Sequence, residues 1–273
     1  MSRRLSVPLV LAFVAALLTT GGASPAPTAT YHRPIVSVGA NKSNNWSGYN
    51  QGTIEQRGKT FTSVSGTWRV PTATAHKAGE NEYSSSWVGI GGGCVNANCT
   101  ITDTTLIQAG TEQDVDSSGR ASYYAWWELI PAPSVRISPS RYPVAAGDVI
   151  RTTIGSPAPG IWTFNMRNQT RGWTWTMRTP YSSSMDTAEW IEETPVVIDN
   201  SGHVSVGPLP NLSGAAFDLA TTNAAPAGLK ASEEIQLVDF NGTPLATPSA
   251  PDTDADGFND CTYASSCAAP AGS

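Results

Sequence analysis

The feature of this chain that most limits its fold is a series of short segments in which apolar and polar residues alternate. A strand places successive side chains on opposite faces, so this alternation indicates strands that bury one face. Glycine, with 25 residues, and proline, with 20, separate the segments, as turns between strands require. The predicted strands are 61–71, 84–90, 106–112, 122–131, 148–154, 161–166, 173–178, 187–193, 196–198, 215–218, 234–239 and 258–263.

Strands at this spacing, with no long stretch of helical period, predict an all-β protein: an antiparallel β-sandwich or barrel with few or no helices. The 273 residues are enough for one large domain of this class, which commonly has about 200–250 residues. The formal net charge is −6 at pH 7, so the sequence offers no basic surface for nucleic acid. Nothing in it indicates an oligomer, and we expect a monomer.

The low share of charged residues predicts how well the fold resists unfolding in acid. Only 14% of residues are charged, against a usual share of about 25%. Acid unfolding mostly follows the protonation of carboxylates that the fold uses in their ionised form. A chain with few charges has few such groups to lose, so we expect this fold to tolerate acid.

The first 40 residues are expected to lie outside the folded domain. Residues 1–23 have the basic start, apolar run and small residues before a cleavage site that mark a secretory signal. A membrane anchor is disfavoured, because the apolar run is shorter than the roughly 20 residues of a span. Residues 24–40 are predicted to form a disordered linker or a short propeptide. The domain is then expected at 41–263, with a tail at 264–273, in a secreted protein.

The four cysteines form two close pairs, Cys94 with Cys99 and Cys261 with Cys267. In an exported protein such pairs usually close small loops as disulfides. A zinc site with four thiolates is the alternative, but these spacings do not suit the usual zinc motifs. The sequence therefore favours two disulfides that hold loops and take no part in chemistry.

The three histidines support neither a metal site nor a serine-based triad. His32 falls in the expected propeptide, while His76 and His203 lie in polar, turn-like contexts. No Gly-x-Ser-x-Gly motif accompanies them. All three are predicted to be solvated residues without a role.

An acidic loop, residues 252–257, resembles the first half of a calcium-binding loop. Its twelfth position, where such a loop carries a bidentate glutamate, is Tyr263. An Asp-Gly turn that leads into strand 258–263 is the favoured interpretation. Weak calcium binding at Asp252–Asp256 stays open.

Three of the predicted strands carry side chains suited to hydrolysis. Gln108 and Glu112 share one face of their strand, because both stand at even positions. Glu128 lies among aromatic residues on a second strand, and Glu193 ends a third. An acid among aromatic side chains is poorly solvated, which raises its pKa. The pattern alone favours ordinary carboxylates at the rim of a sheet.

Six short motifs follow one another along the chain: Asn45-Trp46, SWVGIGG at 86–92, LIQAG at 106–110, AWWE at 125–128, Ile130-Pro131 and AEWIEE at 188–193. Their order and context resemble the glutamic peptidases (the eqolisins, peptidase family G1). The resemblance extends over roughly residues 41–263. The ordered set is specific, although no single motif would be.

The resemblance implies a β-sandwich like the concanavalin A-type lectins, of jelly-roll type, with a groove over one sheet. It implies that Gln108 and Glu193 are catalytic. Many fungal members carry aspartate where this chain has Gly91. Residues that the resemblance places in support of the site or in contact with substrate are Glu128, Glu112, Trp46, Trp87 and Trp126.

These residue types suit the hydrolysis of a polypeptide substrate. An ionised Glu193 can take a proton from an attacking water and pass it to the leaving amine. The amide of Gln108 can orient that water and donate to the developing oxyanion, a role commonly worth about 2.7–4 kcal/mol. Unperturbed glutamate ionises at about pH 4.3, so we expect activity at acidic pH. No metal or organic cofactor is called for.

Two other functions stay open at this point. A lectin-like sandwich with paired acids can be a glycoside hydrolase that uses Glu128 and Glu193. It can also be a non-catalytic module that binds carbohydrate or peptide on a platform made of Trp46, Trp87, Trp126 and Trp127.

Overall fold

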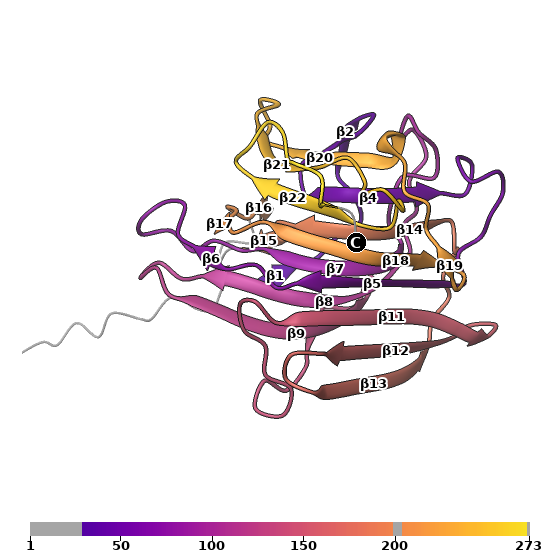
Figure 1. Ribbon diagram of the computed structural model, residues 1–273, viewed down its shortest axis with the longest axis horizontal. Helices are drawn as coiled ribbons and strands as arrows, with labels where there is room; N and C mark the ends of the chain where they lie inside the picture. The colour runs from indigo at the N-terminus through magenta and orange to yellow at the C-terminus, as the bar shows by residue number, and fades with distance from the viewer. Residues whose placement is uncertain (1–28, 199–203, 272–273) are drawn as a thin grey trace, which may run out of the picture.

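The structure of the chain is a computed structural model that describes residues 29–198 and 204–271. Two antiparallel β-sheets pack face to face (Figure 1), which confirms the predicted all-β sandwich. A short 3₁₀ turn, η1 (Ala231–Glu233), is the one helical element in the described residues. The predicted signal at 1–23 and His203 lie outside them.

The front sheet carries the candidate site. Each of its neighbouring strand pairs is antiparallel, and the strands predicted at 84–90, 106–112, 122–131 and 187–193 all belong to it. Its order is β10 (Val135–Arg136), β9 (Ala121–Leu129), β8 (Leu106–Val115), β7 (Ser85–Gly91), β14 (Thr187–Glu193), β4 (Trp46–Gly52) and β20 (Glu234–Val238).

The back sheet closes the other side of the core. Its order is β13 (Trp173–Pro180), β12 (Ile161–Asn168), β11 (Val149–Ala158), β5 (Ser63–Arg69), β18 (Ala215–Thr222), β22 (Phe258–Thr262) and β21 (Pro244–Pro248). Strand β20 belongs to both sheets, because its first residues pair with β4 and its last residues pair with β21. The two sheets are thereby joined along one edge.

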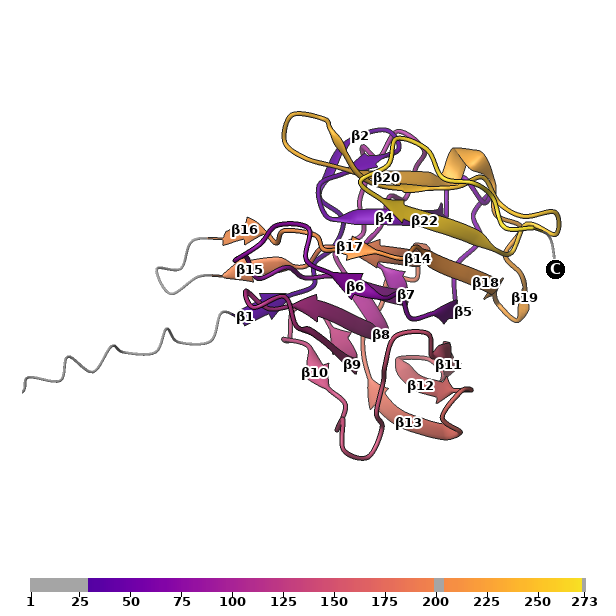
Figure 2. The ribbon, with the colours of Figure 1, turned by 60° about the vertical axis from the view of Figure 1, so that its left-hand side comes forward.

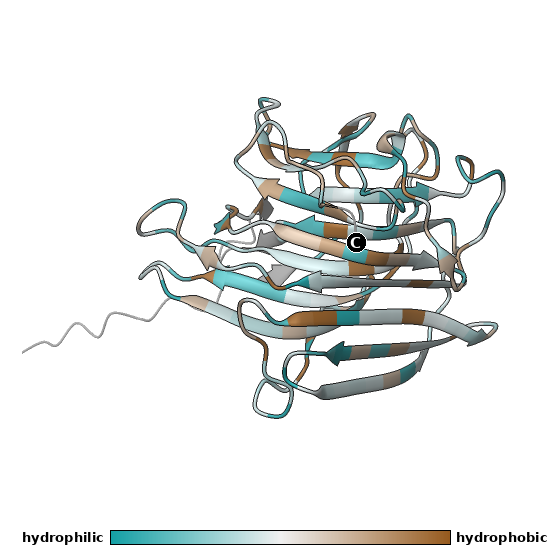
Figure 3. Cartoon of the chain, viewed as in Figure 1, coloured by the Kyte–Doolittle hydropathy of each residue, from teal (hydrophilic) through white to brown (hydrophobic). Residues whose placement is uncertain are grey.

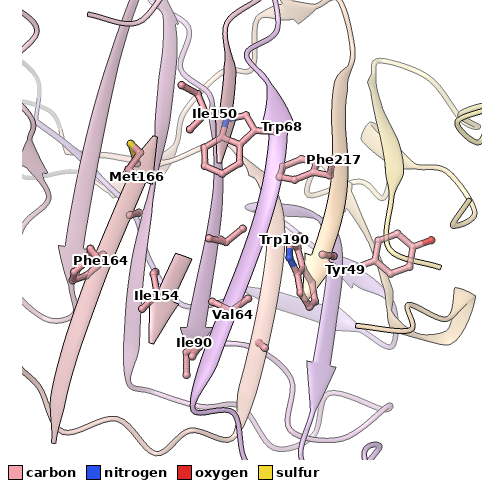
Figure 4. Packing of buried hydrophobic residues seen from close by; sticks show 14 of the residues in the cluster. Tyr49, Val64, Trp68, Ile90, Ile150, Ile154, Phe164, Met166, Trp190 and Phe217 are labelled. Carbon is pink, nitrogen blue, oxygen red and sulfur yellow. The ribbon is translucent and has the colours of Figure 1, made fainter. Parts of the chain in front are cut away.

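Large apolar side chains fill the space between the sheets (Figure 4). Trp190 of β14 reaches across the core and donates from its indole N–H to the backbone oxygen of Ser65, at 2.8 Å. The residues along many strands change from hydrophilic to hydrophobic and back (Figure 3). On β8, Ile107 and Ala109 enter this core. The alternate residues of the front sheet point the other way, onto a surface that we name the site face.

Shorter strands lie around the sandwich. Strands β1 (Ala29–Tyr31), β15 (Val196–Ile198) and β16 (Val204–Val206) form a small sheet at one end of the molecule (Figure 2). The remaining strands are β2 (Ser37–Gly39), β3 (Lys42–Ser43), β6 (Ala73–Thr74), β17 (Asn211–Leu212) and β19 (Ala225–Pro226). The described part of the segment expected to be disordered is therefore ordered, because β1 and β2 both pair with other strands.

Both predicted disulfides, Cys94–Cys99 and Cys261–Cys267, are present, which removes the zinc alternative. Cys94 and Cys99 pack against an apolar cluster that includes Trp46, Trp87 and Trp126. Within the described ranges, no helix has the length and apolar character needed to cross a membrane.

Candidate active site

Strand pairing brings the predicted site residues together on the site face. Three rows of residues cross this face from β14 through β7 and β8 to β9. The first row is Glu193, Ser85, Glu112 and Tyr124; the second is Ile191, Trp87, Gly110 and Trp126; the third is Glu189, Gly89, Gln108 and Glu128. Trp46 of β4 stands beside Glu193. All seven residues implied by the family resemblance thus lie on one face.

Gln108 is held by a carboxyl group on the neighbouring strand. Its amide Nε2 donates to Glu128 Oε2 at 2.7 Å, and both side chains are buried. Burial, opposed by the charge of His32 and reinforced by that of Glu193, raises the pKa of Glu128 to about 7. The predicted increase for an acid among aromatic residues is therefore confirmed. Gln108 keeps a second N–H and its Oε1 for other partners, because an amide has two donors and an acceptor oxygen.

Trp87 positions the Glu193 carboxylate. Its indole N–H donates to Glu193 Oε2 at 2.9 Å, between groups that are both buried. Gly110 makes room for this indole, because a Cβ there would lie 2.4 Å from Ser86 O and 2.5 Å from Trp87 Cβ. The glycine of the LIQAG motif therefore has a steric role at this site.

His32 is the main correction to the sequence analysis. The prediction that it is solvated is wrong, because it is only 3% exposed and lies on the site face. Its Nδ1 is 3.0 Å from Glu193 Oε2, and its Nε2 is 3.4 Å from Glu112 Oε2. Burial lowers the pKa of His32, but these two carboxylates outweigh it and hold the pKa well above the ordinary value. No local pattern in the sequence indicated this position.

Glu112 forms an ion pair with His32. Burial raises its pKa, and the His32 charge opposes this effect. Ser85, which the sequence analysis did not single out, lies between the two carboxylates in the first row and has its Oγ 3.4 Å from His32 Nδ1. Three groups from separate strands therefore surround one imidazole.

The tryptophans divide between the two faces of the front sheet. Trp46 and Trp87 meet edge to face on the site face, with ring centroids 4.9 Å apart. Trp126 stacks against the His32 ring at 3.7 Å. Trp127 lies on the opposite face, against Phe164 of the core. The four-tryptophan platform considered for a binding module therefore does not form.

Gln108 and Glu193 share the site face but do not touch. Gln108 aligns with Gly89 and Glu193 with Ser85, so they are four positions apart along β7 (89 − 85). No hydrogen bond joins them among the described residues. Several buried polar atoms here have no hydrogen-bond partner in the described chain: Gln108 Oε1, Glu128 Oε1, Glu112 Oε1, and the indole nitrogens of Trp46 and Trp126. Buried polar groups without partners cost roughly 1–3 kcal/mol each, and a catalytic role is one reason for a fold to keep them.

Gly91, where the family resemblance implies aspartate in many fungal members, lies in a backbone conformation that disfavours a side chain. Its φ is +89°, and a Cβ there would lie 2.1 Å from the backbone oxygen of Thr105. An aspartate side chain would require a different backbone path at this position. The chain therefore builds this edge of the site without a carboxylate from residue 91.

The acidic loop is remote from the site face. A turn at Asp252–Ala255, in which Ala255 N–H donates to Asp252 O at 3.3 Å, precedes β22. Asp252 and Asp256 come together with Asp218 of β18, with one carboxylate oxygen of each within 4.8 Å of the others. His76 is exposed and stacks on Tyr263.

Comparison with known proteins identifies the group to which this architecture is similar. A sequence model of the Peptidase A4 family matches residues 44–256. No curated protein sequence matches the chain.

Several solved structures are similar in fold. Scytalido-glutamic peptidase, in complex with a transition state analog inhibitor, has 20% identity and a TM-score of 0.58, covering 80% of this chain and 98% of its own. SCP-B, a member of the eqolisin family, has 19% identity and a TM-score of 0.54, covering 81% and 98%. Aspergilloglutamic peptidase from Aspergillus niger has 22% identity and a TM-score of 0.51, covering 66% and 99%.

Proposed function

The chain belongs to the Peptidase A4 family, the glutamic peptidases, and on that premise we propose that it is a secreted endopeptidase that works at acidic pH through Gln108 and Glu193. Membership of the family makes the protein a hydrolase of peptide bonds. The proposal concerns the residues, the pH and the location. One observation supports the residue pair above all: Gln108 and Glu193 lie on the same face of the front sheet, each held by a buried neighbour, Glu128 for Gln108 and Trp87 for Glu193.

Glu193 is the proposed general base. In its ionised form it takes a proton from a water molecule as that water attacks the carbonyl carbon of the scissile peptide. It then passes the proton to the nitrogen of the leaving amine. The hydrogen bond from the Trp87 N–H to Oε2 fixes the orientation of the Glu193 carboxylate. The direction of its other oxygen, Oε1, is thereby fixed as well.

Gln108 is proposed to bind the attacking water and the oxyanion, alongside Glu193. Its Oε1 can accept from the water, and its second N–H can donate to the carbonyl oxygen as negative charge develops there. Donors of this kind typically contribute about 2.7–4 kcal/mol to catalysis. The bond to Glu128 holds the amide still, so little reorganisation is needed when the charge forms.

The acids around the pair favour acidic conditions. A carboxyl group with a pKa near 7, as at Glu128, is neutral in acid. Gln108 is then flanked by an uncharged group, and Glu193 avoids the like-charge repulsion that two ionised acids would impose. Glu112, on the same face, is proposed as a second supporting acid.

The substrate is proposed to be a polypeptide that lies across the tryptophans of the site face. A peptide based transition state analog binds scytalido-glutamic peptidase, and the tripeptide Ala-Ile-His binds SCP-B. Trp46, Trp87 and Trp126 offer apolar contact area to such a chain. Family membership does not support the glycoside hydrolase or the carbohydrate-binding module.

Secretion is proposed from two features. Both cysteine pairs are disulfides, which form and persist in oxidising compartments. Residues 1–23 have the sequence features of a signal. Mass measurement and N-terminal sequencing of exported protein test this part directly.

The dyad is tested by exchanging the amide and the acid, one position at a time. Glu193→Gln and Gln108→Glu should each abolish cleavage of denatured protein at acidic pH, with no change in the folded spectrum. Glu189→Gln is the matched control, since Glu189 lies on the same strand and face as Glu193. Near-normal cleavage by Glu193→Gln, or equal loss in Glu189→Gln, would remove Glu193 from the role of base. Activity should also persist with an aspartic-protease inhibitor of the pepstatin type.

A further inference from the structure

The acidic loop at residues 252–257 takes no part in the proposed chemistry, yet the fold brings a third carboxylate to it. Asp252 and Asp256 belong to the loop, whereas Asp218 belongs to β18 of the back sheet. One carboxylate oxygen of each residue lies within 4.8 Å of the other two. A sequence pattern that resembles half of a calcium loop is thus extended by a residue from a separate strand.

Strand β18 is irregular where Asp218 meets the loop. Its pairing with β5 shifts register after Asp218, and Leu219 has a φ of +54°. The N–H of Ala220 donates to Asp256 O at 2.9 Å, and the N–H of Leu229 donates to Ala255 O at 2.7 Å. The backbone of the loop is therefore held against β18 and against the segment that follows β19.

Two of the three carboxylates are oriented by the backbone through one oxygen. Asp218 Oδ1 accepts from the N–H of Leu219 at 2.7 Å. Asp252 Oδ1 accepts from the N–H of Asp256 at 3.1 Å. A Cβ at Gly257 would lie 2.3 Å from Asp252 Oδ2. The glycine therefore leaves the space that this second oxygen occupies.

The third carboxylate is buried with one oxygen unpaired. Asp256 is 9% exposed, and its Oδ1 has no hydrogen-bond partner among the described residues. Within residues 29–198 and 204–271, no lysine, arginine or histidine forms an ion pair with any of the three aspartates. A buried oxygen without a donor and carboxylates that repel one another are both unfavourable. A bound cation would relieve both.

Calcium suits this set of ligands. It takes carboxylate and carbonyl oxygens at about 2.3–2.6 Å in a flexible geometry, so two ligands of one ion are at most about 5.2 Å apart. Oxygens within 4.8 Å of one another can therefore reach the same ion. Magnesium is usually bound through only one or two carboxylates. Three carboxylates from a loop and a strand favour calcium.

From this arrangement we propose that Asp218, Asp252 and Asp256 form a calcium-binding site that fastens the loop before β22 to β18. The two strands pair in the back sheet (Figure 1), so the ion would stabilise this part of the sandwich. The proposal does not depend on the proposed function. Tyr263 stands where a complete calcium loop has its bidentate glutamate. The dissociation constant should therefore lie in the range of about 10⁻⁴–10⁻³ M that is typical of extracellular calcium modules.

The first test measures binding by calorimetry. Calcium chloride is titrated at neutral pH into the secreted protein after removal of metal with EDTA, and one site in this range is expected. Asp218→Asn and Asp256→Asn should each weaken binding at least about tenfold, because affinity follows the charge count of the ligands. Asp254→Asn is the matched control, since Asp254 is an exposed acid of the same loop outside the three-residue cluster, and it should cost less than Asp218→Asn.

Three results of this titration would overturn the proposal. They are no saturable binding by the wild-type protein, an affinity of Asp218→Asn equal to that of the wild type, and a larger loss in Asp254→Asn than in Asp218→Asn. The far-UV spectrum of each variant establishes that it is folded.

The second test measures thermal unfolding. Calcium at about 10 mM, compared with EDTA at the same ionic strength, should shift the unfolding equilibrium of the wild type about ten- to a hundredfold toward the folded state. The expected rise in Tm is about 3 °C or more, and Asp256→Asn should abolish it. An equal rise in Asp256→Asn would place the effect of the ion elsewhere and refute the site. An equal rise with magnesium would refute the assignment to calcium.

Discussion

Stability should fall as pH rises above the acidic range, and Glu192 should account for much of the fall. Glu192 lies on β14 between the two sheets, where Ser86 Oγ donates to its Oε2 at 2.6 Å. Burial raises the pKa of Glu192 from 4.5 to about 8. Over the pH range between these values the folded protein keeps a proton that the unfolded chain has lost. The associated stability is complete below the unfolded pKa and is lost as pH rises through the folded pKa.

The size of the effect follows from the two pKa values. Each pH unit between them changes the free energy of unfolding by about 1.36 kcal/mol. Between about pH 5 and about pH 7, Glu192 alone should therefore lower stability by about 3 kcal/mol. Burial raises the pKa values of Glu128 and Asp260 to about 7 as well, so these groups act in the same direction.

Urea unfolding followed by tryptophan fluorescence at a series of pH values measures this slope. Glu192→Gln should flatten it by about 3 kcal/mol between these two pH values, because the amide does not titrate. Glu80→Gln is the control, since Glu80 lies at the surface beside Lys77 and should leave the slope as in the wild type. The reasoning is refuted if the wild-type protein is as stable at about pH 7 as at about pH 5, or if Glu192→Gln keeps the full slope.

Two further substitutions examine the site itself. Gly110→Ala should destabilise the fold by about 1–3 kcal/mol through overpacking against Trp87 and Ser86, and should lower kcat/KM by displacing the Trp87 N–H from Glu193. Gly155→Ala, whose Cβ would meet nothing closer than 3.4 Å, is the control in urea unfolding and in the activity assay. Glu128→Gln should remove any loss of activity that sets in near pH 7, since burial raises the pKa of Glu128 to about 7. A pH–rate profile that is the same in this variant as in the wild type would contradict the role given to the Glu128 carboxyl.

Acid tolerance was expected from the small number of charged residues, and the structure offers a further cause. Glu192 and Asp260 are buried carboxyl groups that the fold keeps protonated in acid. Charge counting does not reveal this, because burial depends on which strands pack together. Both groups are expected to favour the folded state most strongly at low pH.

The strands and the faces of their residues could be predicted from the sequence. Alternation along β8 placed Gln108 and Glu112 on one face, and the structure has them there. The disulfides followed from spacing, because five or six residues bring two cysteines within reach with little contribution from the rest of the fold. The increased pKa of Glu128 followed from its aromatic neighbours on the same strand.

The neighbours of each site residue could not be predicted in this way. Trp87 and Glu193 are 106 residues apart in the chain and share a hydrogen bond, and His32 and Glu193 are 161 apart. Side-chain alternation is set by the backbone of each residue and can be recognised locally. Contacts between strands depend on register and packing across the whole sandwich, so only the tertiary structure decided that His32 lies on the proposed catalytic acid.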